Sequence, residues 1–185
     1  MRHPKYGFIA KMIEILVASL LSTASASVPA LVASGELPRG DVEGVSGGSC
    51  PTGWVDASFV DMGCLYFNST KGMTWDDAVS SCHIATTNSS LVEITTEAQM
   101  DFVQMMLEMI EEHEGARHWW TAATDVGING KWFWAATLAL VEDFVWHTGY
   151  PSTLMDRNCM MLHLSYKKGE NYSCENSYYP ICQLK

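Results

Sequence analysis

The sequence predicts a single α+β domain that is cross-linked by disulfides. Two segments with helical periodicity precede a half of the chain that is rich in short aromatic and β-branched runs, and six cysteines are spread over both parts. A chain of 185 residues with 48% hydrophobic and 17% charged side chains has the size and composition to bury one hydrophobic core. Together these observations favour two helices packed beside small antiparallel sheets, with a long loop region.

Residues 1–26 have the layout of a secretory signal peptide. Basic residues at the N-terminus precede the mostly apolar run 13–21, and small residues follow up to Ala26, after which we expect cleavage. The alternative is a signal anchor, because residues 15–33 carry no charge and a bilayer span needs roughly 20 apolar residues. Pro29 and several hydroxyl side chains dilute that stretch, so the signal peptide is the favoured interpretation.

The charge balance argues against two kinds of partner. Removal of residues 1–26 lowers the basic residues from 11 to 8 and the acidic residues from 21 to 20, which leaves a net charge of −12. A surface of that charge repels nucleic acid and anionic lipid. Residues 27–49 are rich in glycine and read as a flexible lead-in, and no segment after them is long and apolar enough to predict a membrane span.

Two start signals predict the helices. Thr74 followed by Asp77 resembles a capping box that opens a helix toward Cys82, and Thr96 followed by Gln99 opens a second helix. The residues expected on the buried faces are Trp75, Ala78, Val79 and Cys82 in the first helix and Met100, Val103, Met106, Leu107 and Ile110 in the second.

Short aromatic and β-branched runs predict strands. One run, 64–67, precedes the first helix, and the others, 132–134, 144–146 and 160–164, follow the second. The segment 127–158 holds few regular elements, so its loops are long enough to need pinning. Disulfides would supply that constraint.

The cysteines agree with secretion. They are even in number, all lie after residue 49, and none has the spacing of a zinc site. We therefore expect disulfides rather than the buried free thiols of a cytosolic protein, although this reasoning leaves the pairing open. Three Asn-x-Ser/Thr acceptors for glycosylation, at Asn68, Asn88 and Asn171, indicate the same compartment.

The order of cysteines, aromatic residues and helix starts forms a specific pattern over residues 50–185. The segments that carry it are Cys50-Pro-x-Gly-Trp54, Cys64 with Tyr66-Phe67, Trp75-x-x-Ala78-x-x-x-Cys82, Leu91-Val92-x-Ile94, Trp120-Thr-Ala-Ala-Thr-Asp125, Trp132-x-Trp134, Cys159, Cys174 and Tyr179-Pro-Ile-Cys182. This pattern resembles a C-type lectin-like domain of the long form. The resemblance implies the disulfides Cys50–Cys64, Cys82–Cys182 and Cys159–Cys174, and core positions for Trp120, Trp132 and Trp134.

In sugar-binding members of that family, a calcium ion bridges the protein and two sugar hydroxyls. Its oxygen ligands flank a cis-proline, stand two residues before the next cysteine, and form an Asn-Asp pair on the neighbouring strand. Here Tyr150 and Ser152 flank Pro151, Arg157 stands before the cysteine, and Glu170-Asn171 matches the strand pair. Tyrosine and serine are weak neutral ligands, and the arginine would repel the ion.

The remaining metal-ligand candidates are few. Asp156, Glu170 and Asn171 are the residues that could still coordinate an ion, and two or three ligands make only a feeble calcium site. We therefore expect calcium-dependent sugar binding to be lost at this loop, with calcium possible but not required. A glycan on Asn171 would itself cover the usual sugar-binding surface, whereas the alternative is that this acceptor stays unmodified beside the Cys174 bridge.

The same loop carries the candidate ligand-binding residues. The resemblance implies a cis bond before Pro151, which would present neighbouring aromatic residues of a kind enriched at contact sites. The alternative is that Trp146 belongs to the core and Tyr150 is only a loop residue. The candidate residues are Trp146, His147, Tyr150, Pro151, Ser152, Glu170 and Asn171.

These observations predict a secreted recognition protein that binds carbohydrate or microbial surface glycans, possibly without calcium. The alternative is a protein-binding lectin-like module whose calcium site has decayed. An enzyme is not indicated, because the histidines are scattered and neither Gly-x-Ser-x-Gly nor His-Glu-x-x-His occurs. The resemblance also suggests a part in innate immunity, and it leaves the oligomeric state open.

Overall fold

The computed structural model describes residues 50–114, 118–163, 165–166 and 168–185. The signal peptide and the lead-in predicted for residues 1–49 lie outside the described residues. Among the described residues, no helix is both long and apolar enough to cross a membrane.

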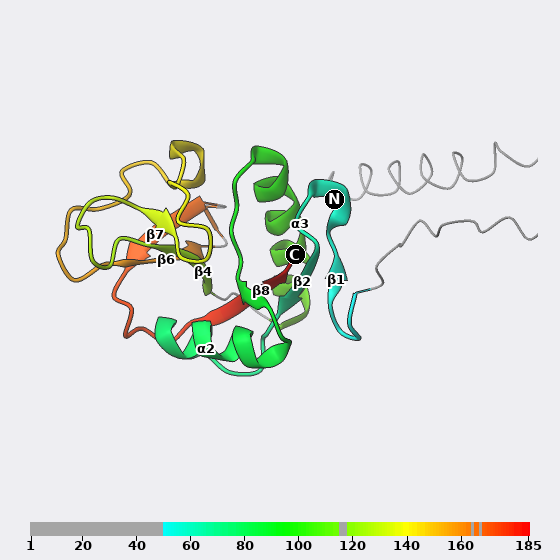
Figure 1. The fold of residues 1–185 in the computed structure, drawn as a ribbon. Coiled ribbons are helices and arrows are strands. Elements are labelled where there is room, and N and C mark those ends of the chain that lie inside the picture. The colour runs from blue at the N-terminus through cyan, green and yellow to red at the C-terminus, as the bar shows by residue number, and fades with distance from the viewer. Residues whose placement is uncertain (1–49, 115–117, 164, 167) are drawn as a thin grey trace, which may run out of the picture. The chain divides into compact units, whose positions relative to one another are not determined.

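Two helices and a mixed sheet make up the described domain, which confirms the α+β prediction (Figure 1). In chain order the elements are β1 (Val55–Asp56), η1 (Ser58–Val60), β2 (Cys64–Phe67), α2 (Trp75–Ala85), β3 (Ser89–Leu91), α3 (Glu97–Glu114), β4 (His118–Thr124), β5 (Phe133–Trp134), η2 (Asp143–Val145), β6 (Cys159–His163), β7 (Lys168–Tyr172) and β8 (Tyr179–Leu184). The strands pair in the order β1-β2-β8-β4-β6-β7, with β3 on β8 and β5 on β4. β4 runs parallel to β8, and the other pairs are antiparallel.

Helix α2 begins as predicted. The Thr74 hydroxyl accepts a hydrogen bond from the backbone N–H of Asp77 at 3.3 Å, which satisfies one of the unpaired donors of the first turn. Trp75, Ala78 and Cys82 are buried, and the helix packs against β3 and β8. The prediction that Val79 faces inward was wrong. Its side chain is 37% exposed, because a buried stripe with spacings of three and four residues leaves the next position on the flank.

Helix α3 also follows its start signal. The Thr96 hydroxyl accepts from the backbone N–H of Gln99 at 3.2 Å, and the Gln99 side-chain oxygen accepts in return from the backbone N–H of Thr95 at 2.7 Å. The predicted apolar stripe packs inward, with Met100, Val103 and Leu107 buried and Met106 and Ile110 partly buried. The helix thereby contributes Met100, Val103 and Leu107 to the hydrophobic core.

The strand predictions held at 64–67, at 133–134 of the run 132–134, and at 160–163 of the run ending at residue 164, which is not described. The prediction of a strand at 144–146 was wrong, because this segment contains the 3-10 helix η2. The backbone N–H groups of Val145 and Trp146 donate to the carbonyls of Glu142 and Asp143, each at 3.2 Å. Local hydrogen bonds between residues three apart thus satisfy the backbone groups of this segment. Its one β-bridge to the sheet joins Trp146 to Gly169.

The three predicted disulfides are present. They join Cys50 to Cys64, Cys82 to Cys182 and Cys159 to Cys174. The second one ties helix α2 to the last strand across a separation of 100 residues. The tryptophans expected in the core are buried as well, namely Trp120, Trp132 and Trp134.

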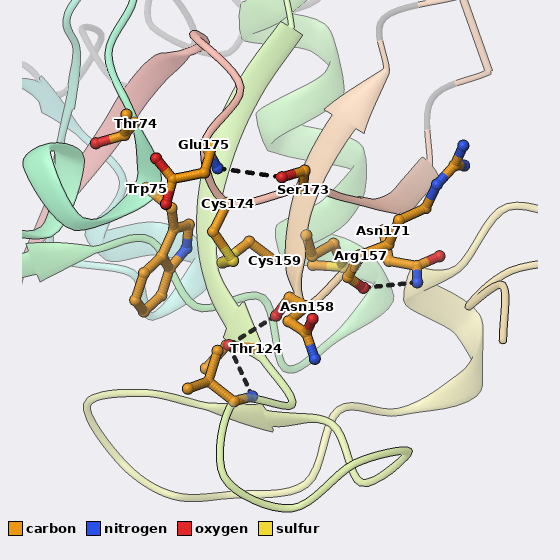
Figure 2. The surroundings of a disulfide bond; sticks show 12 residues. Thr74, Trp75, Thr124, Arg157, Asn158, Cys159, Asn171, Ser173, Cys174 and Glu175 are labelled. Carbon is orange, nitrogen blue, oxygen red and sulfur yellow. Dashed lines mark hydrogen bonds between the residues drawn. A yellow bond between two sulfur atoms is a disulfide. The ribbon is translucent and has the colours of Figure 1, made fainter. Parts of the chain in front are cut away.

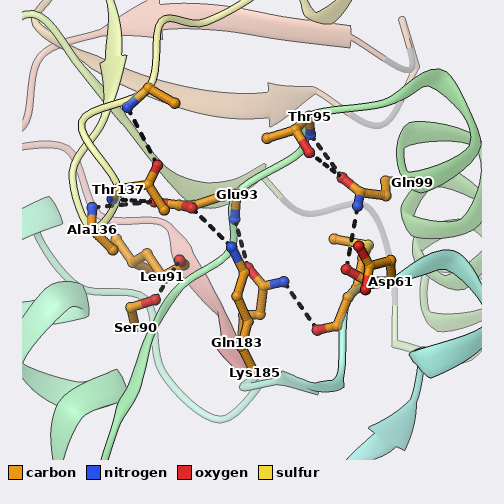
Figure 3. Close-up of polar contacts among 12 residues, drawn as sticks. Asp61, Ser90, Leu91, Glu93, Thr95, Gln99, Ala136, Thr137, Gln183 and Lys185 are labelled. Atoms are coloured by element: carbon orange, nitrogen blue, oxygen red, sulfur yellow. Dashed lines mark hydrogen bonds and ion pairs between the residues drawn. The ribbon is translucent and has the colours of Figure 1, made fainter.

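A buried carboxylate anchors the base of the long loop region (Figure 3). Glu93 is 2% exposed, and its Oε1 accepts from the backbone N–H groups of Ala136 at 3.2 Å and Thr137 at 3.0 Å. Its Oε2 lies 3.1 Å from the Lys185 ammonium, and its backbone N–H donates to Gln183. Through its side chain and its backbone N–H, Glu93 therefore connects residues 136–137 to Gln183 on strand β8 and to Lys185, which follows it.

Candidate functional site

The loop around Pro151 is held by one amide on strand β7. Asn171 is 1% exposed, and its side-chain oxygen accepts from the backbone N–H of Ser152 at 2.6 Å. Its side-chain nitrogen donates to the carbonyl of Ser152 at 2.9 Å. The same nitrogen donates to the carbonyl of Arg157 at 2.8 Å (Figure 2). The bond between Tyr150 and Pro151 is cis, as the resemblance implied. Asn171 thus fastens both limbs of the loop to the sheet.

Glu170, the neighbour of Asn171, has different partners. Its carboxylate is buried, and Oε1 lies 3.5 Å from the Nδ1 of His147. The hydroxyl of Tyr150 is also close to it. Burial, followed by the charge and hydrogen bonding of Glu170, raises the pKa of Tyr150 to about 12. Tyr150 is therefore a neutral phenol throughout the physiological pH range.

A second loop, 125–130, is pinned to the first by the residues before Cys159. The Asn158 side chain donates to Asp125 at 2.7 Å, and the other carboxylate oxygen of Asp125 accepts from the backbone N–H of Gly130 at 2.9 Å. The Thr124 hydroxyl donates to the carbonyl of Asn158 at 2.7 Å, next to the Cys159–Cys174 disulfide (Figure 2). The guanidinium of Arg157 lies over the ring of Tyr172 at 4.9 Å, where a cation–π contact holds it.

A cavity of about 350 Å³ lies between these two loops. It combines an acidic group, an amide and apolar side chains, which is the usual mixture at ligand sites. Its lining residues are Asp125, Asn129, Gly130, Trp132, Pro151, Ser152, Thr153, Leu154 and Met155. Leu154 and Met155 are strongly exposed.

The model of the C-type lectin domain family matches residues 71–184. This chain belongs to the C-type lectin family. A domain of this family is a non-enzymatic binding module, in agreement with the absence of catalytic motifs from the sequence.

Several solved C-type lectin structures are similar to this chain. Human lithostathine is 28% identical, with a TM-score of 0.63, and the match covers 74% of this chain and 99% of that chain. The C-type lectin CEL-I from Cucumaria echinata is 21% identical, with a TM-score of 0.64 and coverage of 74% and 97%. A calcium-independent type II antifreeze protein is 22% identical, with a TM-score of 0.60 and coverage of 73% and 93%. A search of curated proteins found no match.

The residues at the loop do not fit the calcium ion that sugar-binding C-type lectins use. The Asn171 amide already bonds three backbone groups, so neither its oxygen nor its nitrogen is directed at an open position where an ion could bind. The carboxylate of Glu170 lies against His147, and Asp156 is an exposed loop residue. Across the described part of the chain, no group of three His, Cys, Asp or Glu side chains is arranged to hold a metal.

The candidate residues from the sequence fall into two groups in space. His147, Tyr150 and Glu170 lie together on one side of the loop, whereas Pro151 and Ser152 line the cavity. Trp146 packs edge-on against Trp132, with ring centroids 4.8 Å apart, and is partly buried, so its main contact is with the core.

Sequence reasoning missed the other wall of the cavity. Asp125 and Asn129 come from a loop far away in sequence, and the hydrogen bond between the Asn158 and Asp125 side chains joins that loop to the Pro151 loop. The adjacent apolar pair Leu154-Met155 stands in a loop that is otherwise polar, and this pattern could have indicated the wall of the cavity that the Pro151 loop forms.

Proposed function

We propose that this protein is a secreted C-type lectin-like recognition protein that binds carbohydrate or microbial surface glycans at its long loops without calcium. The observation that carries the proposal is the set of three hydrogen bonds between the Asn171 side chain and the backbone of Ser152 and Arg157. In this arrangement the protein's own amide holds the loop where an ion would otherwise be needed. A loop that is ordered before binding loses little conformational entropy when a ligand arrives.

The ligand-contacting surface that we assign is the loop and the cavity beside it. Pro151 and Ser152 line the cavity, and Leu154 on the same loop offers an exposed apolar side chain. Next to them, the side chains of His147 and Tyr150 lie against the buried carboxylate of Glu170. Trp146 supports this surface from below through its contact with Trp132.

The relatives support binding as the kind of function. One solved relative, the cow CD23 carbohydrate-recognition domain, is described with an oligosaccharide, and it is 22% identical to this chain. Another is named a calcium-independent antifreeze protein. The names together indicate that this fold serves different ligands and that one of its uses dispenses with calcium.

We further propose that residues 1–26 direct secretion, that residues 27–49 are a flexible lead-in to the domain at 50–185, and that the protein acts in innate immunity. Asn88 is exposed, and Asn68 accepts a hydrogen bond from the Thr70 hydroxyl at 2.6 Å; we assign glycans to both. Asn171 is the exception among the acceptors. Its amide nitrogen is buried and donates two hydrogen bonds, so we infer that it is unmodified in the folded protein.

Glycan binding in the presence of chelator tests the function directly. The secreted protein is applied to a glycan array in EDTA and in calcium, and we expect the same glycans to bind in both. Leu154→Asp should abolish this binding, because it places a charge at the cavity wall. Leu140→Asp is the matched control, since Leu140 is also an exposed leucine (69% against 54% for Leu154) and does not line the cavity. Binding that requires calcium would contradict the proposal.

A designed gain of function tests the assignment of the loop. Carboxylates or amides are introduced at the positions that match the family's calcium ligands, with the substitutions Tyr150→Glu, Ser152→Asn, Arg157→Glu and Asn171→Asp. We expect calcium to raise the melting temperature of this variant but not of the natural protein, since an ion at a hundred times its Kd adds about 2.7 kcal/mol. If the variant gains no calcium response, the mapping of the loop is wrong.

A protein ligand is the second candidate function. Exposed apolar side chains gather in the loops around the cavity, among them Val126, Ile128, Leu154 and Met155, and such patches mark protein contact sites as well as glycan sites. An array on which no glycan binds in either buffer, together with loss of a protein partner in Leu154→Asp, would favour this alternative.

A further inference from the structure

Helix α3 carries a second apolar stripe, beside the one that faces the core. Phe102, Met105 and Met109 follow one another at spacings of three and four residues, so they lie along one side of the helix. Phe59 of η1 continues this stripe, because its ring meets that of Phe102 edge-on, with centroids 5.1 Å apart. We call these four residues the α3 stripe. Phe59 is 74% exposed, Met105 48% and Met109 46%, so three of the four side chains are open to a partner.

The domain does not need this stripe for its own packing. Met100, Val103 and Leu107 of the same helix are buried in the core, and one such face is enough to hold an amphipathic helix on its domain. No residue of the α3 stripe lines the loop cavity. Large apolar side chains gathered on a surface mark contact sites, and methionine is common where a surface adapts to its partner.

Carboxylates border the α3 stripe. Asp101 stands four residues before Met105, which makes the two side chains neighbours on the helix surface, and Asp61 follows Phe59 by two residues. Both aspartates are exposed. Neither η1 nor helix α3 contains a lysine or an arginine, whereas helix α3 contains six acidic residues. A complementary partner is therefore both apolar and basic.

A polar cavity of about 320 Å³ adjoins the α3 stripe. It is lined by Asp61, two residues after Phe59, and by Gln99, three residues before Phe102. The Gln99 side-chain nitrogen donates to the carbonyl of Asp61 at 3.4 Å, which joins the end of η1 to the start of helix α3 (Figure 3). The cavity and the stripe therefore form one continuous surface.

The charge of this cavity is negative. Its charged lining residues are Asp61, Glu93 and Lys185. The Lys185 ammonium lies 3.1 Å from the Glu93 carboxylate, so these two charges balance and the charge that remains is that of Asp61. Lysine and arginine lay an apolar stem over apolar surface while their charged end stays polar. Such a side chain can lie along the α3 stripe and place its charged end at the cavity.

Other occupants of the surface fit less well. A second copy of this chain would bring the acidic border of one helix α3 against that of the other, and like charges across an interface are costly. Residues 27–49 of the chain itself contain one basic and three acidic residues, which is the same sign of charge as the surface. A basic helix with one apolar face satisfies both the stripe and its carboxylates.

We propose that the α3 stripe, bordered by Asp61 and Asp101, is a docking site for a basic amphipathic helix of a partner polypeptide. The site shares no residue with the loop cavity. The inference is therefore independent of the proposed recognition of glycans.

Binding of synthetic peptides tests the site. A fluorescein-labelled amphipathic helix of leucine and lysine is titrated with the full secreted protein, and fluorescence anisotropy gives the Kd. A second peptide has glutamate in place of every lysine, and a third has the composition of the first but no helical spacing of its leucines. We expect the first peptide to bind at least about tenfold more tightly than either of the others.

Substitutions separate the apolar part of the site from the charged part. Met105→Gln with Met109→Gln removes apolar surface and keeps helix propensity, and it should weaken binding of the basic helix at least about tenfold. Asp61→Asn and Asp101→Asn should each weaken it about fivefold, the effect of one pair of unit charges about 4 Å apart in water. Because the substituted side chains are exposed, the variants should keep the melting temperature of the natural protein.

The matched controls lie on helix α2. Ile84→Gln removes an apolar side chain that is 83% exposed, and Asp76→Asn removes an exposed carboxylate. Both should bind the basic helix as the natural protein does, which excludes a general attraction to a chain of net charge −10. Leu154→Asp should also leave this binding unchanged, so a failure of the glycan proposal is distinguished from a failure of this one.

Four outcomes would overturn the proposal. They are no binding of the basic helix, equal binding of the basic and acidic peptides, unchanged binding in the double methionine variant, and an equal loss in Ile84→Gln. Sedimentation velocity tests the competing occupant. A dimer of the natural protein that disappears in Met105→Gln with Met109→Gln would assign the surface to self-association instead, whereas a monomer in both supports a basic partner.

Discussion

Replacement of Asn171 by alanine should loosen the loop and destabilise the domain. The substitution removes three hydrogen bonds, of 2.6, 2.9 and 2.8 Å, between one buried side chain and the backbone of Ser152 and Arg157. A hydrogen bond of this kind contributes about 0.5–1.5 kcal/mol net. The loss should therefore be about 2–4 kcal/mol, which is a large part of the stability of a domain of this size.

The free energy of unfolding is measured with urea while the disulfides stay intact, in chelator and in calcium. Asn129→Ala is the control, because Asn129 is an exposed asparagine on the neighbouring loop, and it should change the free energy by less than about 0.5 kcal/mol. Hydrogen exchange adds a local measurement, since the amide of Ser152 donates to Asn171 and should exchange much faster in the variant.

The same residue distinguishes an amide anchor from a metal ligand. Asn171→Asp keeps the shape but cannot donate, so a carboxylate would face the carbonyls of Ser152 and Arg157. In chelator we expect Asn171→Asp to be at least as unstable as Asn171→Ala. A fully stable aspartate variant, or an alanine variant within about 0.5 kcal/mol of the natural protein, would refute the idea that this amide holds the loop.

Three further predictions concern the scaffold and the phenol. Glu93→Ala removes a buried acceptor of two backbone N–H groups and should cost about 3 kcal/mol in urea unfolding, whereas the exposed Glu97→Ala should cost little. Loss of the disulfide in Cys82→Ala with Cys182→Ala frees a separation of 100 residues and should cost about 4–5 kcal/mol; a cost under about 1 kcal/mol would contradict the loop-entropy account. In ultraviolet titration one tyrosine should ionise near pH 12, and Tyr150→Phe should remove it. Because the folded-state pKa of Tyr150 lies above the unfolded value near 10, its contribution to stability should be complete below about pH 10 and lost as the pH rises to about 12.

The sequence predicted the fold well because the relevant signals are local. The hydroxyls of Thr74 and Thr96 cap the first turns of their helices whatever the rest of the chain does, and helical spacing then determines the buried face. The predictions that were wrong concern residues whose structure depends on tertiary contacts. Val79 has a side chain suited to the core but lies one position beyond the stripe, and residues 144–146 satisfy their backbone locally because no strand offers them a ladder.

The site was harder to predict because its contacts join side chains to distant backbone. Asn171 was identified as a possible metal ligand from its position, yet its role depends on the carbonyls of Ser152 and Arg157, which any residue type provides. The cavity depends in the same way on the Asn158 side chain reaching Asp125 across 33 residues. No pattern of residue types along the chain encodes such pairings.

The loops are held through their backbone, so their own exposed side chains can determine ligand specificity. The Glu93 carboxylate holds the long loop region by accepting from the backbone N–H groups of Ala136 and Thr137. The Asn171 amide holds it by accepting from the backbone N–H of Ser152. Both side chains therefore bind backbone groups of the loops. The side chains of Leu154 and Met155 take no part in these bonds and are exposed. Substitutions at Leu154 and Met155 should therefore alter ligand binding while they leave the free energy of unfolding within about 0.5 kcal/mol of the natural value. A loop whose stability depended on its own side chains, or on a bound ion, would not allow binding and stability to vary independently in this way.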